Sequence, residues 1–251
     1  MDLKVETEDK DSVIYGAKKL KALTYNLHHG VDSKSRDTLK YIKDYLNNSG
    51  ADFLFLQEID YANKRSNFLD QGDYLSSSLY PYVMESRHHN YKEGHYGNIL
   101  LSKFPINKTA IISLPHNYSG HIVDALEVTH KPEARFITKC KVNVEGEELS
   151  LLNLHLPLAE PDREKSLALL IKEFKNNDKI IMAGDFNIKE LKELSEFDNF
   201  NLNKTYPTYP VDEPIYFLDQ ILCSGVNVLS MESPKIDFSD HYPLLLEFSI
   251  E

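Results

Sequence analysis

The chain has 251 residues, of which 41% are hydrophobic and 11% aromatic, and this composition indicates a globular protein of one domain, or at most two. Lys and Arg total 28 against 39 Asp and Glu, so the formal net charge of −11 disfavours a protein that grips nucleic acid through a basic face. A small phosphorylated substrate stays open, because a bound divalent metal reverses the local potential.

The first 20 residues are expected to form a polar arm, and residues 21–251 a single domain. Residues 1–21 contain no long apolar run and therefore predict neither a signal peptide nor a membrane span. We expect a cytoplasmic monomer, with secretion as the alternative if an export signal has been removed. Cys140 and Cys223 lie in apolar runs without zinc spacing, so buried reduced thiols are expected.

The first predicted strand, residues 20–27, carries Asn26 near its end. Asparagine is a poor strand former, so its amide either faces a site or forms a turn before Gly30. A helix is predicted over residues 36–48 and a buried strand over residues 52–57. Glu58 follows four consecutive apolar residues, where an unpaired carboxylate is costly, which favours a metal ligand over a surface glutamate.

The middle of the chain is rich in histidine. A helix is predicted over residues 68–79 and a strand over residues 82–84, and the polar stretch 87–121 then encloses a strand at residues 97–102. Most of the histidines in this stretch are expected to be solvated bystanders, but their density marks a candidate substrate wall. They are His88, His89, His95, His116 and His121.

Residues 125–128, 135–144 and 148–154 are predicted strands. His155 closes the last of them, either as a site residue or as a core histidine held by backbone groups. A helix opens at Pro161, with acidic residues in its first turn.

The strand at residues 179–183 breaks at Gly184 and leads to Asp185 and Asn187. If extended geometry persists, these two side chains point the same way. A carboxylate beside an amide suits a phosphate or metal site, although an acidic turn is the alternative. A short helix at residues 191–197 and a loop at residues 199–214 are expected to follow.

The last predicted strands are residues 216–223 and 244–248. A second group of acidic and polar residues, like that at Asp185 and Asn187, is associated with them. The first of them buries Asp219, and the pair Asp240-His241 precedes the second. Polar groups thus gather at strand ends throughout the chain, as at one end of a β-sandwich. Oxygen ligands without cysteine favour Mg²⁺, Mn²⁺ or Ca²⁺ over Zn²⁺.

Seven short motifs, in order, make the chain resemble the endonuclease/exonuclease/phosphatase superfamily. The resemblance implies an α+β fold, a four-layer αββα sandwich of two mainly antiparallel sheets flanked by helices. It also implies hydrolysis of phosphoesters with Mg²⁺ or Mn²⁺, Ca²⁺ being a further alternative. The motifs are Thr24-Tyr25-Asn26, Leu56-Gln57-Glu58, Gly97-Asn98-Ile99-Leu100-Leu101-Ser102, Asn153-Leu154-His155, Gly184-Asp185-Phe186-Asn187, Leu218-Asp219-Gln220-Ile221-Leu222 and Ser239-Asp240-His241-Tyr242-Pro243.

By this resemblance Glu58 is the main metal ligand, helped by Asn26 and Asp240. The subgroup with a His-His-Gly sequence after the first asparagine, here His28-His29-Gly30, is the most similar. Gln220 stands where an aromatic residue or histidine is frequent, and the arginines that often precede this motif are absent, which concerns substrate contacts and not the metal centre.

The same resemblance implies roles for five other residues. Asp185 orients or deprotonates the attacking water, or holds a second metal, and Asn187 positions the phosphate. His155 and His241 stabilise charge in the transition state, and Asp219 orients His241.

Membership of a fold does not define a substrate. The first hypothesis is a phosphodiesterase or phosphatase acting on a small molecule or a lipid headgroup. The second is an endonuclease or exonuclease acting on DNA or RNA, which the net charge disfavours, and the third is a catalytically silent binding scaffold. Substrate contacts are expected from Asn98, His29 and Arg65, and a compact positive patch around Arg65 predicts weak salt dependence of substrate binding.

Overall fold

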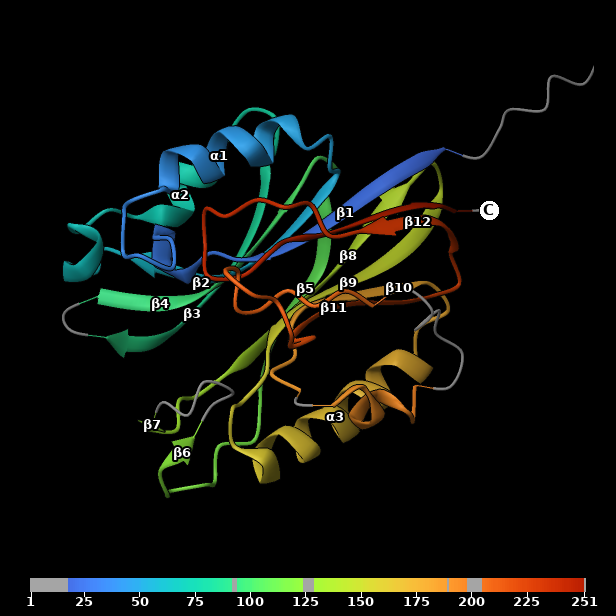
Figure 1. Ribbon diagram of the computed structural model, residues 1–251. Helices are drawn as coiled ribbons and strands as arrows, with labels where there is room; N and C mark the ends of the chain where they lie inside the picture. The colour runs from blue at the N-terminus through green and yellow to red at the C-terminus, as the bar shows by residue number, and fades with distance from the viewer. Residues whose placement is uncertain (1–17, 92–93, 124–128, 189, 198–204, 251) are drawn as a thin grey trace, which may run out of the picture.

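The computed structural model describes residues 18–91, 94–123, 129–188, 190–197 and 205–250 (Figure 1). Almost all of the predicted N-terminal arm, and the strand predicted at residues 125–128, lie outside these residues. The boundary between an arm and a single domain over residues 21–251 therefore stays a prediction.

Two sheets face each other. The first runs in the order β12 (Asn227–Glu232), β13 (Leu244–Ser249), β1 (Lys19–Asn26), β2 (Phe53–Tyr61), β4 (Gly94–Ser102), β3 (Tyr82–Tyr91). The second runs in the order β11 (Asp219–Ser224), β10 (Ile180–Asp185), β9 (Glu147–His155), β8 (Phe136–Val144), β5 (Ile106–Ser113). Two short strands, β6 (Ile122–Val123) and β7 (Thr129–His130), form a separate pair.

Helices cover the outer faces of the sheets. The helices α1 (Leu39–Asn48) and α2 (Gln71–Leu75) lie over the first sheet and α3 (Glu160–Lys175) over the second (Figure 1). Single 3₁₀ turns occur at His28–Gly30, Lys64–Ser66 and Leu191–Leu194. The predicted α+β four-layer sandwich is confirmed, with each sheet mixed rather than purely antiparallel.

Alternation along the strands builds three apolar layers. In β1, Leu20 and Ala22 face the second sheet, whereas Leu23 and Tyr25 face α1. In β9, by the same alternation, residues 149 and 151 face the first sheet and residues 152 and 154 pack with α3. Sheets buried on both faces explain why the strands appear in the sequence as continuous apolar runs.

One parallel strand pair lies at the centre of each sheet. β1 pairs with β2 up to the register Asn26↔Gln57, and β9 pairs with β10 up to the register Asp185↔His155. The other ladders in both sheets are antiparallel. The carboxyl ends of the parallel pairs carry polar residues that continue the inward-facing rows of the core, so these side chains meet where the sandwich opens.

Two elements differ from the sequence-based predictions for local reasons. The helix predicted over residues 68–79 covers only Gln71–Leu75, because Phe68 has a left-handed backbone and the chain becomes extended at Ser76, the first of three serines. Much of the polar stretch at residues 87–121 is in the strands β3, β4 and β5, and strand β12 was not predicted.

Strand β2 does not end before Glu58. It continues to Tyr61. The register of its pairing with β4 shifts between Leu56 and Ile59, which marks a β-bulge there. Glu58 lies within this bulge with φ 61°, a left-handed backbone that redirects its side chain.

A buried pair of amides joins the two sheets beneath the bulge. The Gln57 side-chain nitrogen donates to Asn153 Oδ1 at 2.8 Å. The Asn153 amide in turn donates to the carbonyl oxygens of Leu56, at 3.1 Å, and Ile99, at 2.8 Å, where the ladder between β2 and β4 changes register. Both side chains are fully buried, so these bonds satisfy groups that water does not reach.

We predict that Asn153→Leu lowers the free energy of unfolding by about 3 kcal/mol, because it removes three buried hydrogen bonds, two to backbone carbonyls and one from the Gln57 amide. Urea unfolding of both proteins measures the difference. The control is Asn107→Leu, an exposed strand asparagine, which should change stability by less than about 0.5 kcal/mol. Equal effects of the two substitutions would contradict this account of the bridge.

Candidate active site

A cavity of about 340 Å³ opens where the two parallel strand pairs end. The 3₁₀ turn after β1, the bulge in β2 and the loops before β8 and β13 contribute to its walls. The lining residues are His28, His29, Glu58, Arg65, Tyr96, His130, Lys131, Glu133, Arg135, His155, Leu158, Asp185, Asn187, Tyr209, Leu218, Asp240 and His241.

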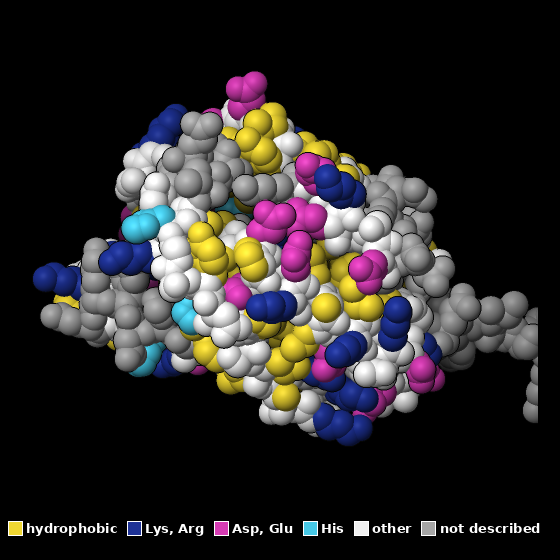
Figure 2. Space-filling view, turned by 90° about the horizontal axis from the view of Figure 1, so that it is seen from below, with side chains coloured by type: hydrophobic (Ala, Val, Ile, Leu, Met, Phe, Trp, Pro, Cys, Tyr) yellow, Lys and Arg dark blue, Asp and Glu magenta, His cyan; other side chains and the backbone are white. Residues whose placement is uncertain are grey.

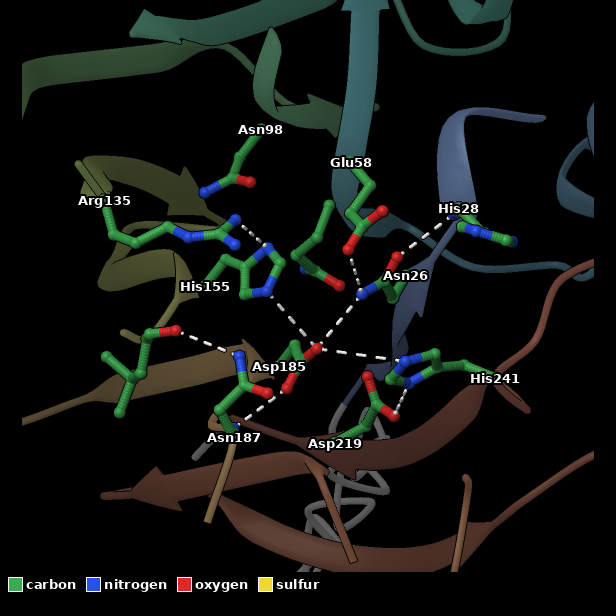
Figure 3. A network of polar contacts seen from close by, with 12 residues as sticks. Asn26, His28, Glu58, Asn98, Arg135, His155, Asp185, Asn187, Asp219 and His241 are labelled. Atoms are coloured by element: carbon green, nitrogen blue, oxygen red, sulfur yellow. Dashed lines mark hydrogen bonds and ion pairs between the residues drawn. The ribbon is translucent and has the colours of Figure 1, made fainter. Parts of the chain in front are cut away.

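Asp185 lies at the centre of the polar network (Figure 3). Its Oδ2 accepts a hydrogen bond from Asn26 Nδ2 at 3.0 Å and lies 3.4 Å from His155 Nε2 and 4.0 Å from His241 Nε2. Burial and, next, the neighbouring Asp219 carboxylate raise the pKa of Asp185 to about 7. A carboxylate with such a pKa is suited to exchange protons near neutral pH.

Two residues near Asp185, Gly184 and Asn187, have positive φ angles. Gly184 has φ 150°, and a Cβ there would lie 1.9 Å from the Leu154 carbonyl oxygen, so only glycine fits against β9. Extended geometry does not continue beyond Asp185, because Asn187 has a left-handed φ of 48°. The Asn187 backbone N–H donates to Asp185 Oδ1 at 2.9 Å and its side-chain amide donates to the Leu156 carbonyl at 3.0 Å. The condition under which the two side chains would point the same way, continued extended geometry, is therefore not met.

Glu58 faces the same network from the first sheet. Asn26 Nδ2 lies 3.2 Å from Glu58 Oε1, so one amide bridges the Glu58 and Asp185 carboxylates (Figure 3). The enclosed position would raise the pKa of Glu58, but the nearby His155 and His28 rings and the Arg135 guanidinium outweigh this effect and hold the pKa well below its usual range. Glu58 is therefore a carboxylate at neutral pH.

His241 and Asp219 form a short, buried pair. His241 Nδ1 lies 2.7 Å from Asp219 Oδ2, which also accepts a hydrogen bond from the Thr208 hydroxyl at 2.6 Å. The ring of Tyr209 packs against the imidazole at a centroid distance of 4.7 Å. Burial alone would lower the pKa of His241, but the charge and hydrogen bond of Asp219 raise it to about 10. His241 is thus an imidazolium at neutral pH.

The Nδ1 atom of His155 faces a hydrogen-bond donor, whereas the Nδ1 atom of His241 faces an acceptor. His155 Nδ1 lies 2.8 Å from an Arg135 guanidinium nitrogen, and its Nε2 faces Asp185 (Figure 3). Both side chains are buried. The two histidines therefore enter the site with opposite hydrogen-bond partners on Nδ1.

The oxygen donors fit a hard divalent cation. Glu58 and Asp240 line the cavity, and the Asn26 side chain contacts Glu58 through its amide nitrogen while its Oδ1 accepts a hydrogen bond from the His28 backbone N–H at 3.1 Å. A second group, Asp185, Asp219 and His241, has donor atoms within 4.8 Å of one another. We favour the first group, because the Asp219–His241 hydrogen bond already occupies one atom of each of these two residues in the second group. The three expected metal ligands thus lie beside one cavity.

Two of the three residues predicted to contact the substrate line the cavity, and the third does not. His29 and Arg65 line the cavity, whereas the buried Asn98 amide lies 3.4 Å from the Phe136 carbonyl in β8, outside the lining. Arg65 forms a bidentate pair with buried Asp60, at 2.8 and 2.7 Å, which compensates much of its charge. Burial, with Arg65 next, lowers the pKa of His29 to about 4, so His29 adds no positive charge. The roles of these residues in substrate binding stay predictions.

The described histidines of the histidine-rich stretch do not line the cavity. Of the histidines in this stretch, the side chains of His95, His116 and His121 are described, and all three are exposed and outside the cavity lining. His95 lies in β4, and His116 and His121 lie in the segment after β5.

Four residues that line the cavity were not predicted as site residues: His28, which was named only as part of a motif, and Tyr96, Arg135 and Tyr209. An arginine directly before an apolar strand was a usable signal for Arg135, since a buried guanidinium requires partners. Tyr209 lies in a stretch read as a plain loop, and nothing in its local pattern distinguishes it.

The endonuclease/exonuclease/phosphatase family model matches residues 23–241. The curated protein "Uncharacterized protein YbhP" of Escherichia coli (strain K12) is 26% identical over 256 residues, which cover 92% of this chain and 96% of that protein. The protein of the same name from Shigella flexneri shows the same identity and coverage.

Solved structures share the fold at low identity. An endonuclease/exonuclease/phosphatase from Beutenbergia cavernae has a TM-score of 0.74 at 15% identity, covering 92% of this chain and 72% of that chain. The Bacteroides thetaiotaomicron mannosyl-6-phosphatase Bt3783 has a TM-score of 0.67 at 18% identity, covering 92% and 100%. The D. rerio TDP2 complex with a single-strand DNA product has a TM-score of 0.67 at 19% identity, covering 92% and 99%.

We predict that Asp219→Asn lowers the pKa of His241 from about 10 toward its ordinary value of 6.5, since burial is then opposed only by the weaker effects of Asp240 and Asp185. The imidazolium is present below the pKa, so wild-type His241 stays charged through neutral pH whereas the variant loses its charge at a lower pH. An NMR titration of His241 in metal-free protein measures both values. Asp237→Asn removes an exposed carboxylate nearby and should shift the pKa little; an unshifted pKa in Asp219→Asn would refute the pairing.

Proposed function

The chain belongs to the endonuclease/exonuclease/phosphatase family, and from this premise we propose that it is a divalent-metal-dependent hydrolase cleaving a phosphoester bond of a small or lipid-derived substrate. The observation that carries the proposal is the convergence of one carboxylate, Asp185, with Asn26, His155 and His241 in a cavity that Glu58 also lines. Acidic, amide and imidazole groups arranged in this way suit acid–base chemistry at a phosphate rather than passive binding.

Glu58, Asn26 and Asp240 would hold Mg²⁺ or Mn²⁺, which supplies Lewis-acid stabilisation of phosphoryl charge when bound. Asp185 orients a water molecule and accepts its proton as the water oxygen attacks phosphorus and the bond to the leaving oxygen breaks. The His241 imidazolium, oriented by Asp219, stabilises the negative charge that develops on the phosphoryl group. Asn187 contributes by holding Asp185 Oδ1 through its backbone N–H, and its amide lies at the cavity wall.

Shape and charge support a compact substrate. The cavity holds one phosphate and a small attached group, and a duplex would require many phosphate contacts along an extended basic surface. Figure 2 shows Lys, Arg, Asp and Glu side chains interspersed on the face it draws, with no continuous basic area among the side chains it colours. Among the described residues, no helix has the length and apolarity to cross a membrane.

We predict that Mg²⁺ or Mn²⁺ raises the melting temperature and that Glu58→Gln abolishes most of this effect. A ligand at 100 times its dissociation constant stabilises the folded state by about 2.7 kcal/mol, so the loss is readily measured. Calorimetric titration gives the metal affinity directly. Glu247→Gln, a glutamate of the same sheet outside the cavity lining, is the control. Equal metal affinity in wild type and Glu58→Gln would remove Glu58 from the metal site.

We predict hydrolysis of at least one member of a panel of nucleotides, sugar and inositol phosphates, phospholipid headgroups, RNA and DNA with Mg²⁺ or Mn²⁺. Asp185→Asn should lower kcat at least about a hundredfold, as loss of a general base does. Near-normal turnover by this variant would exclude Asp185 from the mechanism. Failure of the whole panel would favour a binding scaffold.

The same assay separates small substrates from nucleic acid. For a small phosphoester, KM between low and physiological salt should change with a slope of only one or two released counterions. A steep slope together with preferred cleavage of DNA or RNA would favour the nuclease hypothesis. Arg65→Ala should raise KM moderately without changing that slope by more than about one counterion.

A further inference from the structure

The hydrogen-bond partners of His155 define which of its nitrogens carries a proton. Arginine has five N–H donors, no acceptor and a pKa too high for deprotonation. The 2.8 Å contact between Arg135 and His155 Nδ1 therefore requires a lone pair on Nδ1. The proton of the neutral ring must then be on Nε2, the nitrogen that lies 3.4 Å from Asp185 Oδ2 and faces the cavity.

Arg135 is itself held firmly. Its guanidinium lies 2.9 Å from the Glu133 carboxylate and packs near the Tyr96 ring, with its Cζ 5.8 Å from the ring centroid. The side chain is 7% exposed, and the register Ile137↔Leu154 between β8 and β9 brings it beside His155. A long side chain with so little freedom provides a directional donor and not a diffuse charge.

The other histidine of the site has the opposite environment. His241 Nδ1 faces the Asp219 carboxylate, an acceptor, so both of its nitrogens can carry protons. A second proton on His155 Nδ1 would set an N–H group against the guanidinium N–H. Two groups of one chemical type in opposed environments take different roles in catalysis.

We propose that Arg135 is a positioning residue that fixes His155 as the neutral tautomer with its proton on Nε2. This inference rests on the proposed phosphoester hydrolysis for its catalytic consequence, but not for the tautomer. In the reaction, His155 donates an uncharged hydrogen bond from Nε2 to Asp185 and to a phosphoryl oxygen beside it. It keeps its proton throughout, so proton transfer from water goes to Asp185 alone.

The test combines a spectroscopic and a kinetic measurement. Long-range ¹H–¹⁵N correlation spectra of ¹⁵N-histidine-labelled protein with Mg²⁺ distinguish the two neutral tautomers and the imidazolium, and the spectrum of His155→Gln assigns the signal. Arg135→Met removes the donors but keeps an unbranched stem near Tyr96, whereas Arg135→Gln keeps one N–H donor. Arg65→Met removes the other arginine near the Tyr96 ring, with its Cζ 5.0 Å from the centroid, and is the spectral control.

The wild type and Arg65→Met should show His155 with its proton on Nε2. In Arg135→Met the signal should move to a mixture of tautomers or to the imidazolium, and kcat should fall about ten- to hundredfold with KM changed less than about threefold. Arg135→Gln should recover the tautomer and part of kcat. Arg87→Met, which removes an arginine over Tyr61 outside the cavity lining, should leave kcat unchanged.

The proposal is overturned if wild-type His155 is protonated on Nδ1, or if Arg135→Met keeps the Nε2 tautomer, whatever happens to kcat. It is also overturned if the tautomer changes while kcat does not. If Arg135→Met fails to fold, Arg135→Gln carries the test, because a loss of kcat there with an unchanged melting temperature and tautomer contradicts the assignment. A wild type without phosphoester hydrolysis would refute the proposed function, and the spectra would still decide the tautomer.

Discussion

The structure depends on one buried contact between its two sheets, the pair of amides Gln57 and Asn153. Gln57 donates to Asn153, which in turn donates to the backbone carbonyls of Leu56 and Ile99 beside the bulge in β2. Because these groups are fully buried, separating the sheets would leave several of them unsatisfied, and the spacing of the sheets is therefore tightly specified. Glu58 follows Gln57 directly and His155 follows Asn153 by two residues, so the same contact sets the distance across the site.

Several residues with a left-handed backbone lie where the polar side chains converge. Left-handed conformations occur at His28, His29, Glu58 and Asn187, which all line the cavity. Each costs of order 1–3 kcal/mol and persists because the surrounding sheet structure enforces it. The result is that short segments turn sharply at strand ends and present side chains from both sheets to one small volume.

Different electrostatic surroundings then give chemically similar side chains of the site different properties. Glu58 stays a carboxylate, whereas the pKa of Asp185 is raised to about 7 by burial and by Asp219. His241 is paired with a carboxylate, whereas His155 is paired with a guanidinium. Proteins of this fold act on different phosphoesters, as a mannosyl phosphatase and a DNA-bound TDP2 among the structural neighbours illustrate. The compact cavity and the net charge of −11 support the small-substrate proposal for this chain.

Much of the fold and part of the site could be read from the sequence, because apolar runs and alternation are local properties of a strand. Polar residues such as Asn26, His155 and Asp185 stand out at the ends of such runs, and the inward-facing rows of β1, β9 and β10 lead directly to them. The bulge that turns Glu58 and the contact between Arg135 and His155 were not predictable in this way. Both arise from pairing between segments far apart in the chain, where register and sheet spacing decide which groups meet. For the same reason the described histidines of the histidine-rich stretch lie outside the cavity lining, although Tyr96, next to His95, is part of it: strand direction, and not residue type, determines which side chains reach the cavity.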